Sequence, residues 1–471
     1  MLGVGYNFFA EDVDQMFLMP PSMTDWLPED HLAYFVLDAV EEMDLAAFYA
    51  DYRADGWGGA ARHPKTMVAL LLYAYCTGLL SSRKIEAACH VDVAFRVVCG
   101  NVAPDHTTIA RFRSRHESAL KTLFTASLRL CATAGMTSVG LVAVDGTKMA
   151  APASMARNRS KDFIDQAVEE MFADAAAADA AEDAEPGPDR GDEPPSVLRG
   201  RADRRRRFKA AKQRLDAELQ AENVAHEEHL AWRAAEEAKR GSKLRGRKPK
   251  APDDKAGHKQ RKINTTDPES GVMATAKGFV QGYNAQTVAN DEQVLVSAEV
   301  TDEHNDLGQL HPMIQATAAS LTGAGIDQRP EKLLADAGYA SEENFAALDE
   351  DDQDVPDCYV ATRNMKNNPT PRTGRRGPLK KDATLVDRMD RKVSTKNGNA
   401  LYRRRQHIIE PVFGQIKHAR GIRGFSRRGK AAADSEWKLI CGTHNLLKLY
   451  RRALADPTAA PFSRIGAPAT A

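Results

Sequence analysis

The sequence contains few cysteines, and their spacing does not match the common cysteine-based metal sites. The six cysteines of the 471-residue chain form no CxxC pair, and no histidine lies at zinc-finger spacing from them. We therefore expect no zinc finger, and we interpret the cysteines as reduced core thiols of a cytosolic protein. They stand at positions 76, 89, 99, 131, 358 and 441.

The sequence also predicts no signal peptide and no membrane-spanning segment. The first residues, MLGVGYNFFAEDVDQMF, lack the basic flank and the long apolar core of a signal peptide. No run reaches the roughly 20 apolar residues that a membrane span requires. The length suffices for two or three domains, each with a full core.

The chain has no overall excess of one charge, but its charges are segregated. Residues 1–60 carry 12 acidic side chains against one arginine, whereas residues 361–430 carry 20 basic side chains against 4 acidic ones. A basic block of this density neutralises polyanions, so nucleic acid is the leading partner for that region. A solvated basic surface is the alternative.

Helical periodicity dominates residues 1–135. The predicted helices cover residues 31–43 and 64–77, two short segments over 81–92 and 93–100, and one long segment over 104–135. Asp105 or Thr107 would cap the long helix, which also carries Arg111 and Arg113. This pattern is compatible with a helix-turn-helix-like DNA-binding domain, and a packing or dimerisation bundle would look similar.

A long charged segment interrupts the chain over residues 161–262. Its two predicted helices carry sparse apolar stripes, and the second is too sparse to bury much surface alone. The stripe residues are Ile164, Val168, Met171 and Phe172 in the first helix, and Phe208, Leu215 and Leu219 in the second. We interpret the segment as an insertion that contacts DNA or a partner, or that serves as a solvated spacer.

The remaining segments predict an α/β fold with a mixed sheet flanked by helices. The predicted elements are a buried strand over 139–144, an antiparallel hairpin over 277–301 with its turn at Asn290-Asp291, a helix over 305–323 capped by Asn305 or Asp306, strands over 332–335 and 358–364, a helix over 400–419 capped by Asn399, and a last helix over 435–454. Pro411 would kink the helix over 400–419 or start a new one.

Three carboxylates stand out in this arrangement. Asp145 and Asp336 each follow an apolar strand, and Glu410 lies on a late helix. Alone, each would usually be a turn, cap or solvated residue, but together they suit a hard divalent cation, which prefers oxygen ligands. Two such cations activate water and stabilise charge on the oxygens of a phosphodiester. Lys417 follows Glu410 by about two helical turns and would hold a phosphate.

Four motifs in this order resemble a known family. They are VAVDGTKM, KGFVQGYNAQ, LADAGYASEEN and RRRQHIIEPVFGQIKHARGIRGFSRRG. They look like the bacterial insertion-sequence transposases with an Asp-Asp-Glu (DDE) triad on a ribonuclease-H-like core, and the inserted segment ending in NTTDPES looks most like the insertion-sequence eleven-eighty-two group. Related transposases have three residues between the Arg and the Glu of their last motif, whereas four separate Arg405 from Glu410 here. We therefore leave Tyr402 out of the catalytic set and assign Arg405 to the DNA-binding surface.

The resemblance implies a Mg²⁺-dependent transposase in which Mn²⁺ substitutes. Asp145, Asp336 and Glu410 would bind metal, and Lys417 would complete the catalytic set. The enzyme would nick the transposon end and join the freed 3′-OH to target DNA, acting as a homodimer on double-stranded DNA in a bacterial cytoplasm, at the nucleoid. The predicted DNA-binding residues are Arg111, Arg113, Arg375, Arg376, Arg403, Arg404, Arg405, Lys417, Arg423, Arg427 and Arg428.

The predicted domain organisation follows from these segments. It comprises an N-terminal helical domain over 1–135, the first part of the catalytic core over 136–160, the insertion over 161–262, the rest of the core over 263–455, and a flexible tail over 456–471. Two other functions use the same residues: a non-catalytic DNA-binding relative, and a nuclease without strand transfer.

Overall fold

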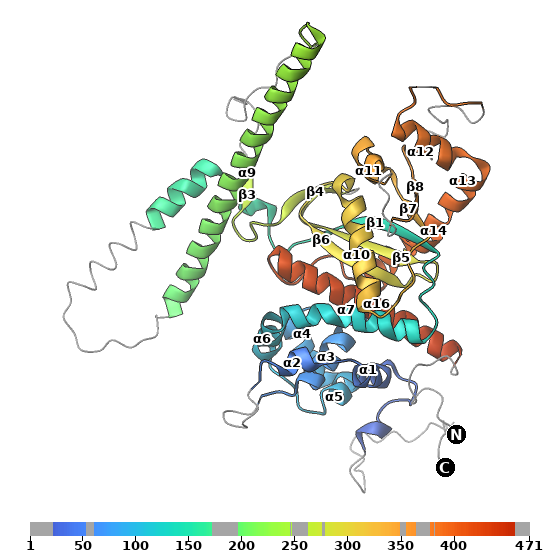
Figure 1. The fold of residues 1–471 in the computed structure, drawn as a ribbon. Helices are drawn as coiled ribbons and strands as arrows, with labels where there is room; N and C mark the ends of the chain where they lie inside the picture. Colours follow the sequence, from blue (N-terminus) through green and yellow to red (C-terminus); the bar gives the residue numbers. More distant parts are fainter. Residues whose placement is uncertain are drawn as a thin grey trace, which may run out of the picture. The chain divides into compact units, whose positions relative to one another are not determined.

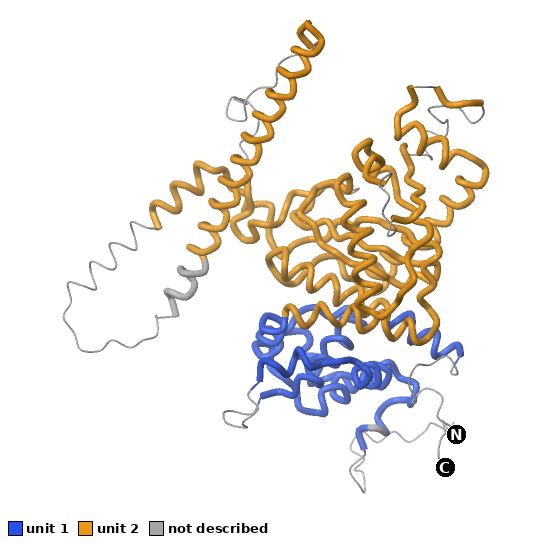
Figure 2. Tube along the Cα trace, viewed as in Figure 1, with its two compact units in different colours: residues 1–116, 446–471 blue, residues 117–445 orange. Residues whose placement is uncertain are grey.

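The computed structural model describes residues 22–52, 61–171, 196–244, 246, 262–275, 278–348, 355–363, 377–380 and 382–456. The chain divides into two compact units, which Figure 2 shows in different colours: residues 1–116 with 446–471, and residues 117–445. Within the described ranges, no helix combines the length and the apolar character needed to cross a bilayer. All six cysteines are free and buried, as expected for core thiols.

The first unit is helical throughout its described ranges. Its elements are η1 (Met23–Asp25), α1 (Leu32–Glu41), α2 (Ala46–Tyr49), α3 (Pro64–Cys76), α4 (Ser82–Val91), α5 (Val93–Val98), α6 (His106–Arg115) and the end of α16 (Lys430–Ala455). Helix α3 is the centre of this unit, because Val68 to Leu72 are completely buried. A helix that is apolar on all sides must be covered by its neighbours.

The long helix predicted over residues 104–135 is two helices. Asp105 caps α6 as predicted, accepting from the Thr108 backbone N–H at 2.9 Å, but the helix ends at His116 and α7 (Glu117–Thr133) begins afresh. His116 is buried, and its ring lies 4.5 Å from that of Phe112 and 5.5 Å from that of Phe48. The break between α6 and α7 therefore lies where the His116 side chain packs into the core. The apolar periodicity of residues 104–135 did not predict it. The unit boundary falls at the same place.

The second unit contains a mixed six-stranded sheet. Its strands are β1 (Leu141–Ala150), β4 (Gly271–Thr275), β5 (Gly278–Asn290), β6 (Leu295–Thr301), β7 (Lys332–Ala335) and β8 (Asp357–Val360). The order is β4-β5-β1-β7-β8, with β6 also paired to β5. Strands β1, β7 and β8 run parallel, whereas β5 is antiparallel to both β1 and β6. The predicted hairpin and mixed sheet are confirmed.

Helices α10 (Leu310–Gly323) and the first part of α16 flank this sheet (Figure 1). The second unit also contains α7, η3 (Leu307–Gln309), η4 (Ala337–Tyr339) and α11 (Glu342–Ala347). Helix α10 packs on β5 and β6. The Trp437 indole of α16 is fully buried and donates to the Gln286 carbonyl at 2.9 Å, which joins that helix to β5.

The helix predicted over residues 400–419 is broken into several pieces. They are α13 (Lys396–Arg403), α14 (Arg405–Ile408), α15 (Glu410–Gly414) and a π-helical turn (Gln415–Ala419), preceded by α12 (Leu385–Ser394). Thr395, not Asn399, caps α13. Pro411 lies in the first turn of α15, where its missing N–H costs nothing, so the alternative of a new helix near Pro411 is correct.

The inserted segment forms an arm with a small core of its own. Residues 161–171 are helical, and α9 (Ser196–Arg240) follows. The apolar stripes of the two helices pack against each other in one buried cluster, which contains Ile164, Phe208, Leu215 and Ile263. The prediction for Phe172 lies outside the described residues. A two-stranded ladder of β2 (Asn158–Ser160) and β3 (Lys262–Asn264) closes the base of the arm.

Candidate active site

Asp145 lies in the middle of β1, not at its end as predicted. The strand continues to Ala150 because β5 remains paired with it along that stretch. On the other side, pairing with β7 stops at Ala143, which lies opposite Leu334. Asp145 is thus the residue at which β1 loses its parallel neighbour, and its backbone position is fixed by the antiparallel one.

Asp336 directly follows β7. The last pair between β1 and β7 is Ala143 with Leu334, and Asp145 and Asp336 each lie two residues further along, so the same register places them side by side. Its Oδ1 accepts from the Gly338 backbone N–H at 2.8 Å and caps the short helix η4. The two aspartates therefore reach the same edge of the sheet from parallel strands.

Arg405 brings Glu410 to the two aspartates. Its guanidinium lies 2.7 Å from Asp145 Oδ2, 3.6 Å from Asp336 Oδ2 and 3.4 Å from Glu410 Oε1. Arg405 is 8% exposed, and its Nε has no hydrogen-bond partner. Three carboxylates from distant parts of the sequence thus share one buried cation.

The electrostatics of Asp145 reflect this environment. Burial raises its pKa to about 7, an effect that Arg405 opposes and the charge of Asp336 reinforces. Burial lowers the pKa of Arg405, but the carboxylates outweigh that effect and raise it above its usual value. The carboxylates therefore need a cation between them, since a buried carboxylate is costly when uncompensated.

The donor set suits a hard divalent metal, although the present arrangement is not a closed metal site. Among the described residues, no three His, Cys, Asp or Glu side chains are placed to hold one metal ion. Arg405 instead contacts all three carboxylates. Oxygen ligands that already converge on one positive charge fit Mg²⁺ or Mn²⁺ once the guanidinium withdraws.

Lys417 reaches β1 from the π-helical turn. Its ammonium donates to the Lys148 carbonyl at 2.8 Å. Burial, together with the charges of Arg423 and Lys148, lowers its pKa to about 8. The Lys417 ammonium is therefore held against β1 at a position three residues beyond Asp145.

Two polar residues on β5 and a fourth carboxylate also border the site, and our sequence reasoning missed them. Asp306 Oδ1 accepts from Asn284 Nδ2 and Gln286 Nε2, each at 2.7 Å. Gln286 in turn accepts from the buried Tyr339 hydroxyl. The signal that could have found them is the polar pair at alternate positions, 284 and 286, which places two amide side chains on one face of the predicted strand.

The predicted DNA-binding arginines have different surroundings. Arg113 is buried and donates to the Tyr75 hydroxyl and the Leu80 carbonyl, and Arg427 is paired with Glu117, so both act inside their units. We therefore remove Arg113 and Arg427 from the DNA-binding set. Arg404 pairs with Asp291 at the surface, and Arg405 belongs to the carboxylate cluster. The exposed members are Arg111, Arg403, Arg404, Arg423 and Arg428, while Arg375 and Arg376 lie outside the described residues.

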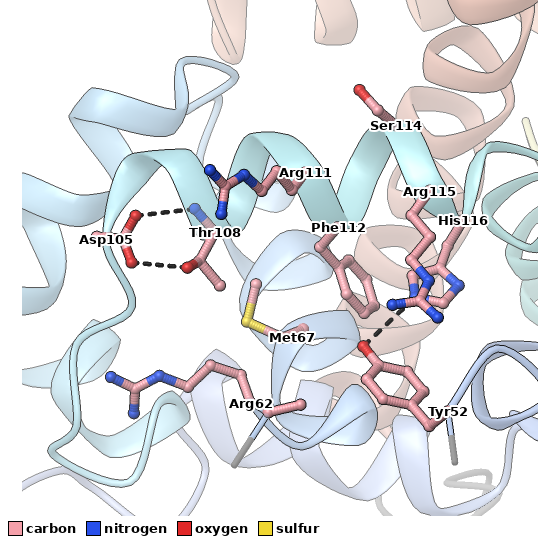
Figure 3. A pocket seen from close by; sticks show the side chains of 11 residues that line it. Tyr52, Arg62, Met67, Asp105, Thr108, Arg111, Phe112, Ser114, Arg115 and His116 are labelled. Atoms are coloured by element: carbon pink, nitrogen blue, oxygen red, sulfur yellow. Dashed lines mark hydrogen bonds between the residues drawn. The ribbon is translucent and has the colours of Figure 1, made fainter. Parts of the chain in front are cut away.

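A pocket of about 820 Å³ in the first unit is lined by three arginines (Figure 3). Arg62 donates to the Ala103 carbonyl, and Arg115 lies 5.0 Å from the centre of the Tyr52 ring. Arg111 projects from α6 and makes no hydrogen bond or ion pair with the described residues. Asp105 also lines the pocket, and Arg115 pairs with Asp51 at 3.6 Å, so the lining carries charges of both signs.

Two family models match the chain. A transposase domain (DUF772) matches residues 21–115, and a transposase DDE domain matches residues 351–450. Glu410 and Lys417 lie within the second match, whereas Asp145 and Asp336 lie outside both. No curated protein and no solved structure matches the chain. Together with the mixed α/β fold, the two matches support a DDE transposase.

Proposed function

We propose that the protein cuts DNA at the ends of an insertion sequence and joins them to a target in a metal-dependent reaction. The observation that carries the proposal is the convergence of Asp145, Asp336 and Glu410 on one cation. These residues come from a central strand, a neighbouring strand end and a late helix. A structural ion pair would need only one carboxylate for Arg405, so three in one place indicate a site for a higher positive charge.

The sheet supports a ribonuclease-H-like core. The order β6-β5-β1-β7-β8, with an antiparallel hairpin beside parallel strands, places the first two carboxylates side by side at the centre. The long charged arm between β1 and the hairpin supports the insertion-sequence eleven-eighty-two group.

Each side chain has a role in this chemistry. Asp145, Asp336 and Glu410 would hold Mg²⁺, which when bound activates water and stabilises charge on the phosphodiester oxygens. Arg405 keeps the carboxylates together and must turn away as the metal enters. Lys417, anchored on the Lys148 carbonyl, would steady a phosphate. Because two DNA ends must be joined to one target, we expect a homodimer on DNA.

The test is cleavage of a labelled duplex that carries the element's own terminal repeat. We expect cuts at the repeat end with Mg²⁺ or Mn²⁺ and none with Ca²⁺ or EDTA. Addition of a target duplex should then give joined products, which separates a transposase from a simple nuclease. Salt-sensitive binding without cleavage in either metal would contradict the proposal and favour a non-catalytic DNA-binding relative.

Two adjacent arginines allow a matched test of the DNA-binding surface. Arg428 is exposed, whereas Arg427 is paired with Glu117 and its side chain is only 12% exposed. We expect Arg428→Ala to weaken DNA binding for all sequences and to reduce the slope of log affinity against log salt by about 1, because one phosphate contact is lost. Arg427→Ala should lower the melting temperature and leave that slope unchanged. The reverse assignment of effects would contradict this surface.

A further inference from the structure

Asp306 borders the proposed active site without belonging to the triad. It precedes η3, where a helix cap would be expected, but its side chain makes no capping hydrogen bond. Its Oδ1 instead accepts from Asn284 Nδ2 and Gln286 Nε2, each at 2.7 Å, and lies 3.4 Å from Lys148 Nζ. The carboxylate is therefore turned away from the helix and held against the sheet.

Two glycines leave the space that Asp306 occupies. Gly146 follows Asp145, and a Cβ atom there would lie 2.5 Å from Asp306 Oδ1 and closer still to Gln286. Gly338 lies two residues after Asp336, and a Cβ atom there would lie 3.0 Å from Asp336 Oδ1 and 3.3 Å from Asp306 Oδ2. A side chain at either position would displace the Asp306 carboxylate or its neighbours.

The second oxygen of Asp306 lies near another carboxylate. Its Oδ2 and Asp336 Oδ1 border the same point beside Gly338, whereas the hydrogen bonds of Asp306 to Lys148, Asn284 and Gln286 all end on Oδ1. Lys148 approaches Oδ1 rather than Oδ2. Two carboxylates in this relation repel each other unless a cation lies between them or one takes up a proton.

Arg405 is an independent sign that the site calls for a cation. It is more than nine-tenths buried, and its Nε is left without a hydrogen-bond partner among the carboxylates. Its ion pairs reach Asp145, Asp336 and Glu410, but in the described structure none reaches Asp306. The guanidinium thus compensates the triad, whereas the cation paired with Asp306 is Lys148, on the Oδ1 side.

We propose that Asp306 is a fourth metal-binding carboxylate, which together with Asp336 holds one of the divalent cations of the site. This inference rests on the proposed metal-dependent function. Asn284 and Gln286 fix Oδ1, so that Oδ2 is presented to the ion in a defined direction. Lys148 also pairs with Oδ1, so a metal ion would bring its positive charge to the Oδ2 side.

The test is Mn²⁺ binding to the full-length protein without DNA, measured by calorimetry. We expect Asp306→Asn to weaken one Mn²⁺ by about 10- to 100-fold, the range seen when a metal site loses a supporting group. Gly338→Ala, which keeps every charge but crowds the shared space, should weaken the same ion to a smaller degree. Glu303→Gln removes an exposed charge from the same loop and should leave binding within about twofold.

The controls separate failure of this inference from failure of the proposed function. Melting temperatures of the metal-free variants should match the wild type, and Gly338→Ala provides the answer if Asp306→Asn is poorly folded. Unchanged Mn²⁺ binding in both variants, while Asp145→Asn loses it, would overturn the role of Asp306 and leave the triad intact. A wild-type protein that binds no Mn²⁺ would overturn the proposed function and this inference with it.

Discussion

Replacing Asp145, Asp336 or Glu410 with alanine should each reduce DNA cleavage at the transposon end at least about a thousandfold, which corresponds to about 4 kcal/mol of lost transition-state stabilisation. The physical reason is that each carboxylate supplies part of the negative charge that would hold the metals. A carboxylate makes no favourable contact with a DNA phosphate, so removal of any of the three should not weaken DNA binding.

The measurement is single-turnover cleavage beside a gel-shift titration on the same duplex. Asp327→Ala removes an exposed carboxylate outside the site and serves as the matched control. Asp145→Ala also deprives Arg405 of its shortest ion pair, so its melting temperature must be recorded. Full cleavage by any of the three triad variants would contradict the assignment of that residue.

As the pH rises toward 7, metal affinity should increase about tenfold for each pH unit, and above pH 7 it should become constant. The pKa of Asp145 is raised from its usual 3.8 to about 7, mainly by burial and despite Arg405. Below pH 7 the folded protein therefore carries a proton on Asp145, which a bound cation must displace. Above pH 7 the carboxylate is already ionised and no proton is released.

The same shift determines how the metal-free protein responds to pH. At pH values between about 4 and 7, the folded state binds a proton on Asp145 that the unfolded state does not, so the contribution of Asp145 to stability falls as the pH rises through this window.

The pH dependence of metal affinity is measured by calorimetry with Mn²⁺ in buffers of different ionisation enthalpy, from pH 5.5 to 8.5, which gives both the affinity and the number of protons released. Affinity that is constant across pH 5.5 to 7, or an unaltered profile in Asp145→Asn, would contradict this explanation.

The positions of two carboxylates follow closely from the sequence pattern. Asp336 directly follows β7 as predicted, and although β1 continues past Asp145 to Ala150, the parallel register brings the two residues together. The hairpin that holds β1 on its other side was equally evident from alternation and turn residues. These predictions succeed because strand pairing in a sheet is set by local patterns that repeat every two residues.

The role of Arg405 could not be predicted, because it depends on breaks in a helix. In a continuous helix each residue is rotated by about 100° from the one before it. Arg405 and Glu410 are five positions apart, so their side chains would point in different directions. The helix breaks at Arg404 and again at Ile409, and the arginine therefore reaches all three carboxylates. The π-helical turn around Lys417 is a further irregularity of the kind often found at functional sites.

The sequence left the cap of the helix over residues 305–323 open between Asn305 and Asp306. An Asn-Asp pair before an apolar periodic segment usually caps a helix, and Asn305 does accept from the Leu307 backbone N–H at 3.2 Å. Distant partners decide which of the two side chains caps the helix and which turns inward. Gln286 lies 20 residues and Asn284 22 residues earlier in the sequence. Tertiary partners of this kind leave no trace in local periodicity.

The ladder of β2 and β3 makes the arm a replaceable module. Asn264 donates to the Ser154 carbonyl and to Asn158 Oδ1, each at 2.9 Å, so the two ends of the insertion are fastened to each other and to the sheet by their own bonds. The entropy cost of a loop grows only with the logarithm of its length, by about 0.6 kcal/mol for each doubling. The chain between these strands can therefore lengthen, shorten or be exchanged for a reporter domain while the strands that carry the carboxylates keep their register.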